Sequence, residues 1–162
     1  MQDIFNKTEE ELTAQGFRID RKDFNRPWGG FLVIDETQAA AFAEKYFPGL
    51  AAKDLINGRK VSPKILLVAP EKRLSWQYHH RRSEVWRAVK NDVGVIRSDT
   101  DAQTELQTIS EGDFITLKKG ERHRLVGLSN WGTVAEIWQH TDPEHPSDED
   151  DIVRLQDDFG RK

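Results

Sequence analysis

The chain has 162 residues, of which 36% are hydrophobic and 32% charged, and its formal net charge is −4 at pH 7. This length predicts a single domain, residues 1–162, that is long enough to bury a core. Nucleic-acid-binding proteins usually have a basic excess, so the acidic balance predicts no nucleic-acid partner. The chain contains no cysteine, which excludes disulfides, thiolate metal sites and a cysteine nucleophile.

No targeting or membrane-spanning segment is recognisable in the sequence. The opening stretch, MQDIFNKTEEELTAQG, has no apolar core behind a basic start, which a signal peptide would need. No apolar run approaches the ~20 residues of a membrane helix. We therefore expect a cytoplasmic protein without a membrane partner.

The N-terminal part, about residues 1–25, is predicted to be a helical extension. Thr8 and Glu11 have the spacing of a capping box, and Gly16 is suited to end a helix. The motif RPWGGFLVI, residues 26–34, follows, and its proline and glycines predict a turn into a strand.

A second helix is predicted over residues 36–47. Asp35 and Gln38 have the spacing of an N-cap and the third helical position. Pro48 and Gly49 then end the helix. Apolar residues recur along it at helical spacing, at Ala39, Phe42, Ala43 and Tyr46.

From residue 64 to residue 140 the sequence changes to short segments rich in β-branched and aromatic residues. Turn residues such as Asn91–Asp92 and Lys119–Gly120 separate these segments at intervals of roughly 8–12 residues. This pattern predicts a β-sandwich or small barrel.

The last segment, residues 147–161, is predicted to be a helix. Ser147 is a candidate N-cap, and acidic residues follow it in the first turn. Ile152, Leu155 and Phe159 would share the apolar face of this helix.

The motif LSWQYHHRRSEVW combines adjacent histidines with other potential metal ligands. On a strand, Gln77 and His79 point to one side and His80 to the other. Glu84 begins the next segment, and His123 opens a later strand after a glycine turn. Such oxygen and nitrogen donors suit a divalent metal. A buried hydrogen-bond network would fit the same pattern.

Four motifs in order, RPWGGF, LSWQYHHRRSEVW, GERHRL and EDDIVRLQDDFGR, resemble the type II mannose-6-phosphate isomerases, which are cupins. In many of these the isomerase is the C-terminal part of an enzyme that also contains a mannose-1-phosphate guanylyltransferase. The resemblance implies an all-β cupin double-stranded β-helix, or jelly-roll barrel, with short peripheral helices at the N-terminus, at about 36–47 and at the C-terminus. The barrel core would be residues 64–140. A helical insertion at 36–63 departs from the usual family pattern.

The resemblance also implies a ligand set for one divalent metal, with zinc expected. Related type I isomerases have Gln-x-His followed by Glu-x-Trp and a later histidine. In this chain the set corresponds to Gln77, His79, Glu84 and His123.

Three positions depart from the family pattern. Arg81 replaces the second histidine of the usual His-x-His pair, and Val85 replaces the histidine before the tryptophan. A glycine that usually closes the first cupin motif is replaced near Asn91, a residue type that tolerates a left-handed turn.

The reaction implied by the resemblance is an aldose–ketose isomerisation of a sugar phosphate. Arg82 and Arg124 are candidates for the phosphate, because a guanidinium binds phosphate in bidentate fashion. Both could instead be surface arginines, and strand alternation turns Arg124 away from the site. Glu136 matches a family glutamate and is the candidate general base or acid, although it could also be structural. Lys64 and Trp86 are candidate substrate contacts.

Other functions fit the same residues. The chain could be a non-catalytic cupin that binds a sugar or sugar phosphate, or another cupin sugar enzyme such as an epimerase. A dioxygenase is disfavoured because it generally uses two histidines and a carboxylate in a different pattern. The sequence does not name the sugar and leaves the oligomeric state open, although cupins often form homodimers.

Overall fold

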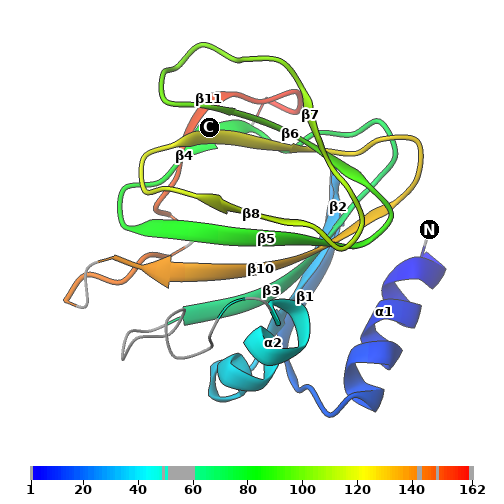
Figure 1. Cartoon of the computed structure of the whole chain (residues 1–162). Coiled ribbons are helices and arrows are strands. Elements are labelled where there is room, and N and C mark those ends of the chain that lie inside the picture. Colours follow the sequence, from blue (N-terminus) through cyan, green and yellow to red (C-terminus); the bar gives the residue numbers. More distant parts are fainter. Residues whose placement is uncertain (1, 49, 51–60, 142–143, 149, 161–162) are drawn as a thin grey trace.

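The structure is a computed structural model that describes residues 2–48, 50, 61–141, 144–148 and 150–160. In this part of the chain, two antiparallel sheets face each other and enclose the core (Figure 1). The larger sheet has the strand order β1 (Ile19–Arg26), β2 (Gly29–Ile34), β3 (Val61–Val68), β10 (Gly132–His140), β5 (Arg82–Lys90) and β8 (Phe114–Leu117). The smaller sheet has the order β11 (Val153–Gln156), β4 (Trp76–Tyr78), β9 (Arg122–Val126), β6 (Val93–Ser98) and β7 (Gln107–Ile109).

The alternation of side chains along β5 separates the two faces of the larger sheet. Trp86 and Ala88 belong to the apolar cluster between the sheets, whereas Val85 belongs to a cluster on the opposite face. Both faces are apolar, as expected for a sheet that is covered on both sides. Glu84 is therefore a polar residue at a position that points inward.

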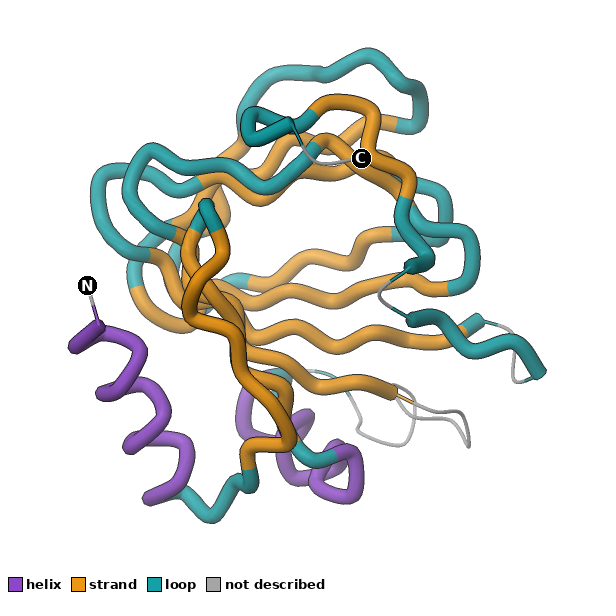
Figure 2. Tube along the Cα trace, turned by 180° about the vertical axis from the view of Figure 1, so that it is seen from behind, coloured by secondary structure: helices purple, strands orange, loops and turns teal. Residues whose placement is uncertain are grey.

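Helices cover the outer face of the larger sheet, as Figures 1 and 2 show. Phe5 and Phe42 from the helices pack in one cluster with Val85 and Ile137 from the sheet. Neither helix in the described residues is long and apolar enough to span a membrane. The helical elements are α1 (Gln2–Ala14), the 3-10 turn η1 (Glu36–Gln38) and α2 (Ala39–Tyr46).

Both N-terminal helices were expected, but the predicted capping box is wrong. Helix α1 begins at Gln2, so Thr8 lies inside it, and the Thr8 hydroxyl donates to the Ile4 carbonyl at 2.8 Å. Gly16 follows the helix with a φ of +91°, as its predicted role requires. The Asp35 side chain caps η1 by accepting from the Thr37 N–H, which confirms the predicted N-cap.

The predicted C-terminal helix is wrong. Val153–Gln156 form strand β11, which pairs with β4 and places Arg154 opposite Gln77. The Ser147 hydroxyl donates to the Asp151 carboxylate at 2.6 Å, so it caps no helix. The exposed edge of β4 explains the difference, because strand pairing satisfies backbone groups that a separate helix would leave open.

The strands expected between residues 64 and 140 are all present. Asn91 has a φ of 63°, so it takes the left-handed turn that the sequence predicted. Strand β1 was missed, since residues 1–25 were expected to be helical. Of the expected insertion 36–63, residues 49 and 51–60 lie outside the described residues. A homodimer and a cytoplasmic location stay predictions.

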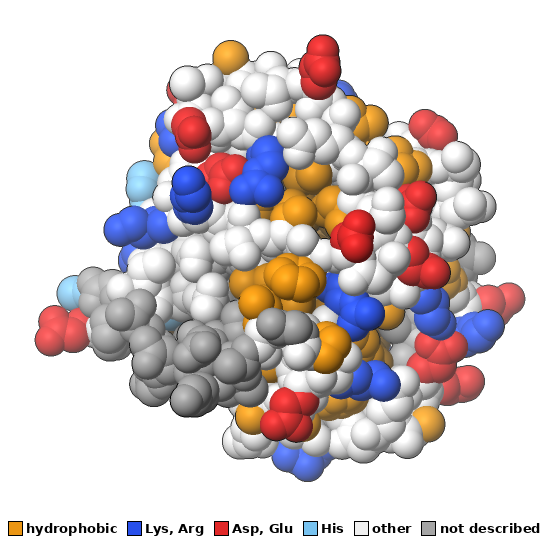
Figure 3. All heavy atoms as spheres, in the orientation of Figure 1, with side chains coloured by type: hydrophobic (Ala, Val, Ile, Leu, Met, Phe, Trp, Pro, Cys, Tyr) orange, Lys and Arg blue, Asp and Glu red, His pale blue; other side chains and the backbone are white. Residues whose placement is uncertain are grey.

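The face of the molecule in Figure 3 shows hydrophobic side chains near its centre, with basic and acidic side chains distributed around them. Among the described residues, the large hydrophobic side chains that are exposed are Leu106, Phe114 and Leu155. Charged side chains of both signs are interspersed on the face that Figure 3 shows.

Candidate metal centre and ligand cavity

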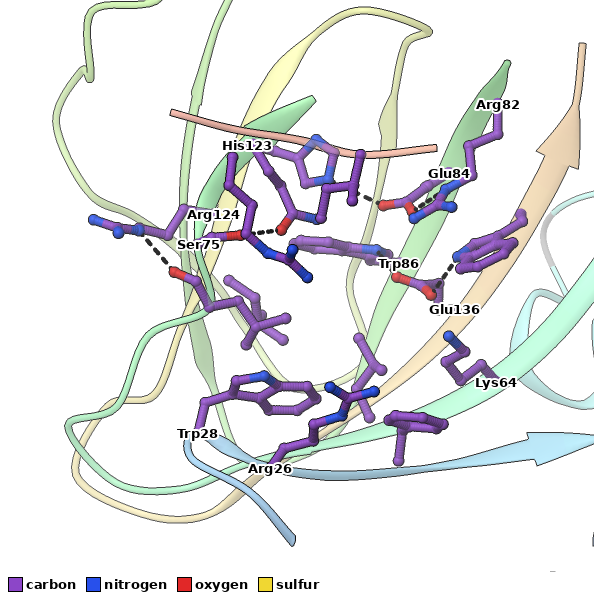
Figure 4. A pocket seen from close by; sticks show the side chains of 18 residues that line it. Arg26, Trp28, Lys64, Ser75, Arg82, Glu84, Trp86, His123, Arg124 and Glu136 are labelled. Carbon is purple, nitrogen blue, oxygen red and sulfur yellow. Dashed lines mark hydrogen bonds and ion pairs between the residues drawn. The ribbon is translucent and has the colours of Figure 1, made fainter. Parts of the chain in front are cut away.

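A cavity opens between the two sheets, and side chains from both line it (Figure 4). Its charged and imidazole-bearing lining residues are Arg26, Lys64, Arg82, Glu84, His123, Arg124, Glu136 and Arg154. Its tryptophans are Trp28, Trp86 and Trp138. A concave site with aromatic walls and a few convergent polar groups is the usual form of a small-molecule site.

Three of the four predicted metal ligands converge beside this cavity, and two of them, Glu84 and His123, line it. His79, Glu84 and His123 are each about 2% exposed, and their ligand atoms lie within 4.8 Å of one another. The Nε2 atom of His79 is 3.6 Å from Glu84 Oε2, and that of His123 is 3.2 Å from Glu84 Oε1. Strand β5 of the larger sheet supplies the carboxylate, and β9 and the end of β4 in the smaller sheet supply the imidazoles.

Backbone carbonyls fix the orientation of both imidazoles. His79 Nδ1 lies 2.6 Å from the Asp151 carbonyl, and His123 Nδ1 lies 3.1 Å from the Glu121 carbonyl. A carbonyl can only accept, so each Nδ1 carries a proton, and in the neutral imidazole each Nε2 presents a lone pair. Metal-binding histidines are typically oriented by such hydrogen bonds.

This donor set fits a divalent cation. Glu84 Oε1 and His123 Nε2 are buried acceptors without a hydrogen-bond partner among the described residues, although they face each other. Burial lowers the pKa of His79 to about 3, which keeps its imidazole neutral. Burial acts to raise the pKa of Glu84, but the Arg82 guanidinium together with the His79 and His123 imidazoles holds that pKa well below the usual range. Three acceptors around one point leave a place for a cation.

Gln77 lies beside this triad but is turned partly away from it. Its backbone pairs with His123, and its Nε2 is 3.3 Å from His79 Nε2. Its Oε1 accepts from the Ser75 hydroxyl. A role as fourth ligand therefore requires the amide to turn and stays a proposal. His80 is exposed, as strand alternation predicted.

Arg82 is buried at the same wall and contacts two of the triad residues. Its Nε donates to Glu84 Oε2 at 2.9 Å, and its Nη2 is 3.2 Å from His79 Nε2. Its guanidinium carbon lies 3.5 Å from the centroid of the Trp138 ring. Nη1 donates to the Ser147 hydroxyl at 3.2 Å. Arg82 thus joins the triad to the segment that precedes β11.

Glu136 is fixed beside the triad by two tryptophans. Trp86 Nε1 and Trp138 Nε1 each donate to a different oxygen of its carboxylate at 2.7 Å. Burial, followed by the negative charge of Glu84, raises the pKa of Glu136 to about 7. Lys64 is directly opposite Glu136 in the β3–β10 pair, and its Nζ lies 4.3 Å from the Trp138 ring centroid.

Arg124 is turned away from the triad, as alternation along β9 predicted. It is fully buried, and its Nε donates to the Leu74 carbonyl at 2.8 Å, an interaction visible in Figure 4. Its Nη2 donates to the Gln156 carbonyl at 3.2 Å. These bonds connect β9 to the chain before β4 and to the end of β11.

Sequence reasoning missed four residues of the site. Arg26 and Trp28 were used only as part of the RPWGGF motif, and Asp151 and Arg154 were placed in a predicted helix. The arginine in RPWGGF gave a usable indication, because a charged residue beside a buried turn is unusual. The other two could be placed only after the pairing of β11 with β4 was known.

The chain matches the family described as mannose-6-phosphate isomerase C-terminal over residues 37–157. It belongs to this family. Among its relatives, the xanthan biosynthesis protein XanB of Xanthomonas campestris pv. campestris (strain B100) is 30% identical over 136 residues, which are 84% of this chain and 23% of that protein. The alginate biosynthesis protein AlgA of Pseudomonas aeruginosa is 30% identical over 155 residues, 94% of this chain and 26% of that protein. The chain thus spans about a quarter of these relatives.

Solved structures confirm the cupin fold of this family member. A variant of Bacillus subtilis oxalate decarboxylase superposes with a TM-score of 0.57 at 11% identity, over 83% of this chain and 30% of that one. Vicilin from tomato superposes with a TM-score of 0.53 at 17% identity, over 86% of this chain and 34% of the vicilin chain. At these identities the likeness concerns the fold alone.

Proposed function

We propose that this chain is a metal-dependent aldose–ketose isomerase that acts on a sugar phosphate, with mannose 6-phosphate as the expected substrate. The observation that carries the proposal is the convergence of three buried acceptor atoms, on His79, Glu84 and His123, at the wall of a cavity with an excess of cationic side chains. Membership of the mannose-6-phosphate isomerase C-terminal family supports it.

The metal would be held by His79, Glu84 and His123, with Gln77 as a fourth ligand. A set of imidazole nitrogens and side-chain oxygens suits zinc. When bound, such an ion with an open position polarises the carbonyl or hydroxyl oxygen of the sugar as a Lewis acid.

Glu136 would move the proton in the reaction. Isomerisation takes a proton from the carbon next to the carbonyl and returns it to the former carbonyl carbon, through an enediol, while the proton of the neighbouring hydroxyl passes to the former carbonyl oxygen. A carboxyl whose pKa is about 7 can both accept and return that proton near neutral pH. The two tryptophan N–H donors fix its plane, so its remaining lone pairs have a defined direction.

Arg82 and Lys64 would stabilise the negative charge that develops on the enediol oxygens. Both are buried cations next to Glu136, and both influence its pKa. Fixed charges in a cavity shielded from water stabilise such charge strongly. Trp86 would form the floor on which the sugar lies, since its ring lies between Glu136 and His123.

Metal analysis combined with a coupled mannose 6-phosphate isomerase assay tests the proposal. We expect Glu84→Gln and His123→Ala to lose both metal and turnover. Glu136→Gln should keep the metal and lose turnover by roughly 100-fold or more. The exposed Glu10→Gln is a matched control for the loss of a carboxylate. Bound metal without turnover on a panel of aldose phosphates would contradict the isomerase.

One observation favours a second candidate, a non-catalytic cupin that binds a sugar phosphate. Arg82 already donates to Glu84 Oε2 and lies within hydrogen-bonding distance of His79 Nε2, so a side-chain cation contacts two of the metal-binding groups. Protein that purifies without metal, and binds mannose 6-phosphate without converting it, would favour this candidate. Analysis of the products would separately identify an epimerase.

A further inference from the structure

We propose that Arg26 and Arg154 form a subsite for the phosphate group of the substrate, at the part of the cavity away from Glu84 and Glu136. This inference rests on the proposed function in one respect, namely that the ligand is a phosphorylated sugar. The subsite fixes the direction of the substrate, with its carbonyl end at the triad and its phosphate at the two arginines.

The glycine turn between β1 and β2 holds Arg26 at the cavity. Arg26 pairs with Gly29 across this turn. A Cβ on Gly29 would lie 1.9 Å from the Leu67 carbonyl oxygen, so the turn is pressed directly against β3. Trp28, at the tip of the turn, is only 5% exposed and lines the same cavity. The RPWGG sequence therefore builds one end of the cavity.

Contacts with Asp23 and Phe31 hold the Arg26 guanidinium in place on one side. Its Nε is 3.1 Å from Asp23 Oδ2, and its guanidinium carbon lies 5.4 Å from the Phe31 ring centroid. Among the described residues, that Nε is buried without a well-directed hydrogen bond. Figure 4 shows Arg26 beside Trp28, with Trp86 between this end and His123. The planar fork of an arginine matches two phosphate oxygens.

Arg154 reaches the same cavity from the opposite sheet. The pairing of β11 with β4 places it opposite Gln77. Directly paired residues project to the same face of a sheet, so Arg154 shares the inward face with Gln77. It is half-buried and lines the cavity. The two arginines therefore come from strands on opposite sides of the space that the substrate would occupy.

The charges of the cavity favour this direction of binding. Among the described lining residues, the carboxylates are Glu84 and Glu136, and Figure 4 shows both near Arg82 and Lys64. The lining cations at that end, Arg82 and Lys64, therefore have these carboxylates beside them (Figure 4). Arg82 is already bonded there to Glu84. Arg26 and Arg154 offer their positive charge to the phosphate at the other end of the cavity.

The test uses Arg26→Gln and Arg154→Gln, with Arg18→Gln as a matched control. The Arg18 side chain is 65% exposed and pairs with Asp35, so this control removes one positive charge from the surface. Titration calorimetry with inorganic phosphate should show at least a tenfold loss of affinity in both cavity variants and none in the control. The phosphate affinity of Arg26→Lys should lie between those of wild type and Arg26→Gln, because lysine keeps the positive charge but lacks the planar fork of the guanidinium.

Steady-state kinetics give the second measurement. For mannose 6-phosphate we expect KM to rise at least tenfold in both cavity variants, with kcat within about threefold of wild type, because the phosphate does not react. If one variant fails to fold, as judged by its thermal unfolding, the other still decides.

The outcomes distinguish a failure of the proposed phosphate subsite from a failure of the proposed isomerase activity. Loss of phosphate binding in the variants, with no turnover by the wild type, would retain the subsite and reject the isomerase. Turnover with an unchanged KM in both variants would reject the subsite and retain the isomerase. Wild-type protein that binds no phosphate, or variants that bind it as the wild type does, would also overturn the subsite.

Discussion

At the scale of single residues, Arg82 would compete with a bound metal ion for the same atoms. Its Nη2 contacts His79 Nε2, whose lone pair is also the proposed ligand, and its Nε uses one oxygen of Glu84. Two cations about 4 Å apart repel each other by ~4 kcal/mol at an effective dielectric constant of about 20. The guanidinium would therefore weaken the binding of a metal ion, while it orders the Glu84 carboxylate.

We predict that Arg82→Gln binds divalent metal at least tenfold more tightly than wild type. The substitution removes a positive charge and releases the His79 lone pair. Competition with a chromophoric chelator measures the affinity. Arg87→Gln is the control, because Arg87 lies on the same strand and its guanidinium donates to the Tyr46 carbonyl on the outer face. Weaker metal binding in Arg82→Gln would show that Arg82 acts mainly as a support for Glu84.

Glu136 gives the stability a defined pH dependence. Its folded-state pKa, about 7, is above its ordinary value of 4.5. The folded state therefore holds this proton more tightly than the unfolded state. The resulting stabilisation is fully present below pH 4.5 and is lost as the pH rises through 7.

We predict that wild type loses about 3 kcal/mol relative to Glu136→Gln between pH 4.5 and pH 8. Urea unfolding of both proteins across this range, with a chelator present to remove metal, measures the difference. Parallel stability curves for the two proteins would show that Glu136 is not protonated by burial in the folded state.

At the scale of elements, the turn between β1 and β2 and the strand β11 determine the shape of the cavity. The turn depends on Gly29, which has a φ of +144° and has no room for a Cβ. Strand β11 depends on a turn in which the Asp151 carboxylate accepts from the N–H groups of His80 and Arg81 at 2.9 Å. The Asp151 carbonyl also orients His79. The segment that ends the barrel thus orients a candidate metal ligand.

Gly29→Ala should destabilise the protein by about 3 kcal/mol or more, since it combines a strained φ with a steric clash against β3. Gly112→Ala is the matched control. Gly112 also has a positive φ, of +93°, but no atom lies within 4 Å of its added Cβ. We expect that control to lose only about 1 kcal/mol. If chemical denaturation shows the same loss of unfolding free energy in both variants, the turn can move away from β3.

At the scale of the whole molecule, the candidate metal centre connects the two sheets. Glu84 belongs to the larger sheet and His123 to the smaller one. Their facing atoms, Oε1 and Nε2, lie 3.2 Å apart without a well-directed hydrogen bond. A bound ion would join the two sheets through both atoms.

Added zinc should therefore raise the unfolding temperature of the wild type. The free energy of unfolding should rise by about 2.7 kcal/mol when the concentration of free metal is 100-fold above Kd. Differential scanning calorimetry measures it. His80→Ala removes an exposed imidazole outside the triad and should respond as wild type does, whereas His123→Ala should show no zinc-dependent shift. A shift that persists in His123→Ala would place the metal elsewhere.

Local sequence patterns were sufficient to predict the strands of the barrel, the helix after Asp35 and the separation of His79 from His80. These follow from local rules: side chains alternate along a strand, and turn residues interrupt it. The same rules turned Arg124 away from the site. They failed at residues 147–161, where an acidic, amphipathic pattern predicted a helix.

The contacts between residues far apart in the sequence could be known only from the folded chain. The open edge of β4 selected the strand β11, and that pairing brought Arg154 to the cavity and the Asp151 carbonyl to His79. Burial in the folded chain also raised the pKa of Glu136. Local patterns contain no information about such long-range pairing, because its energy comes from groups far apart in the chain.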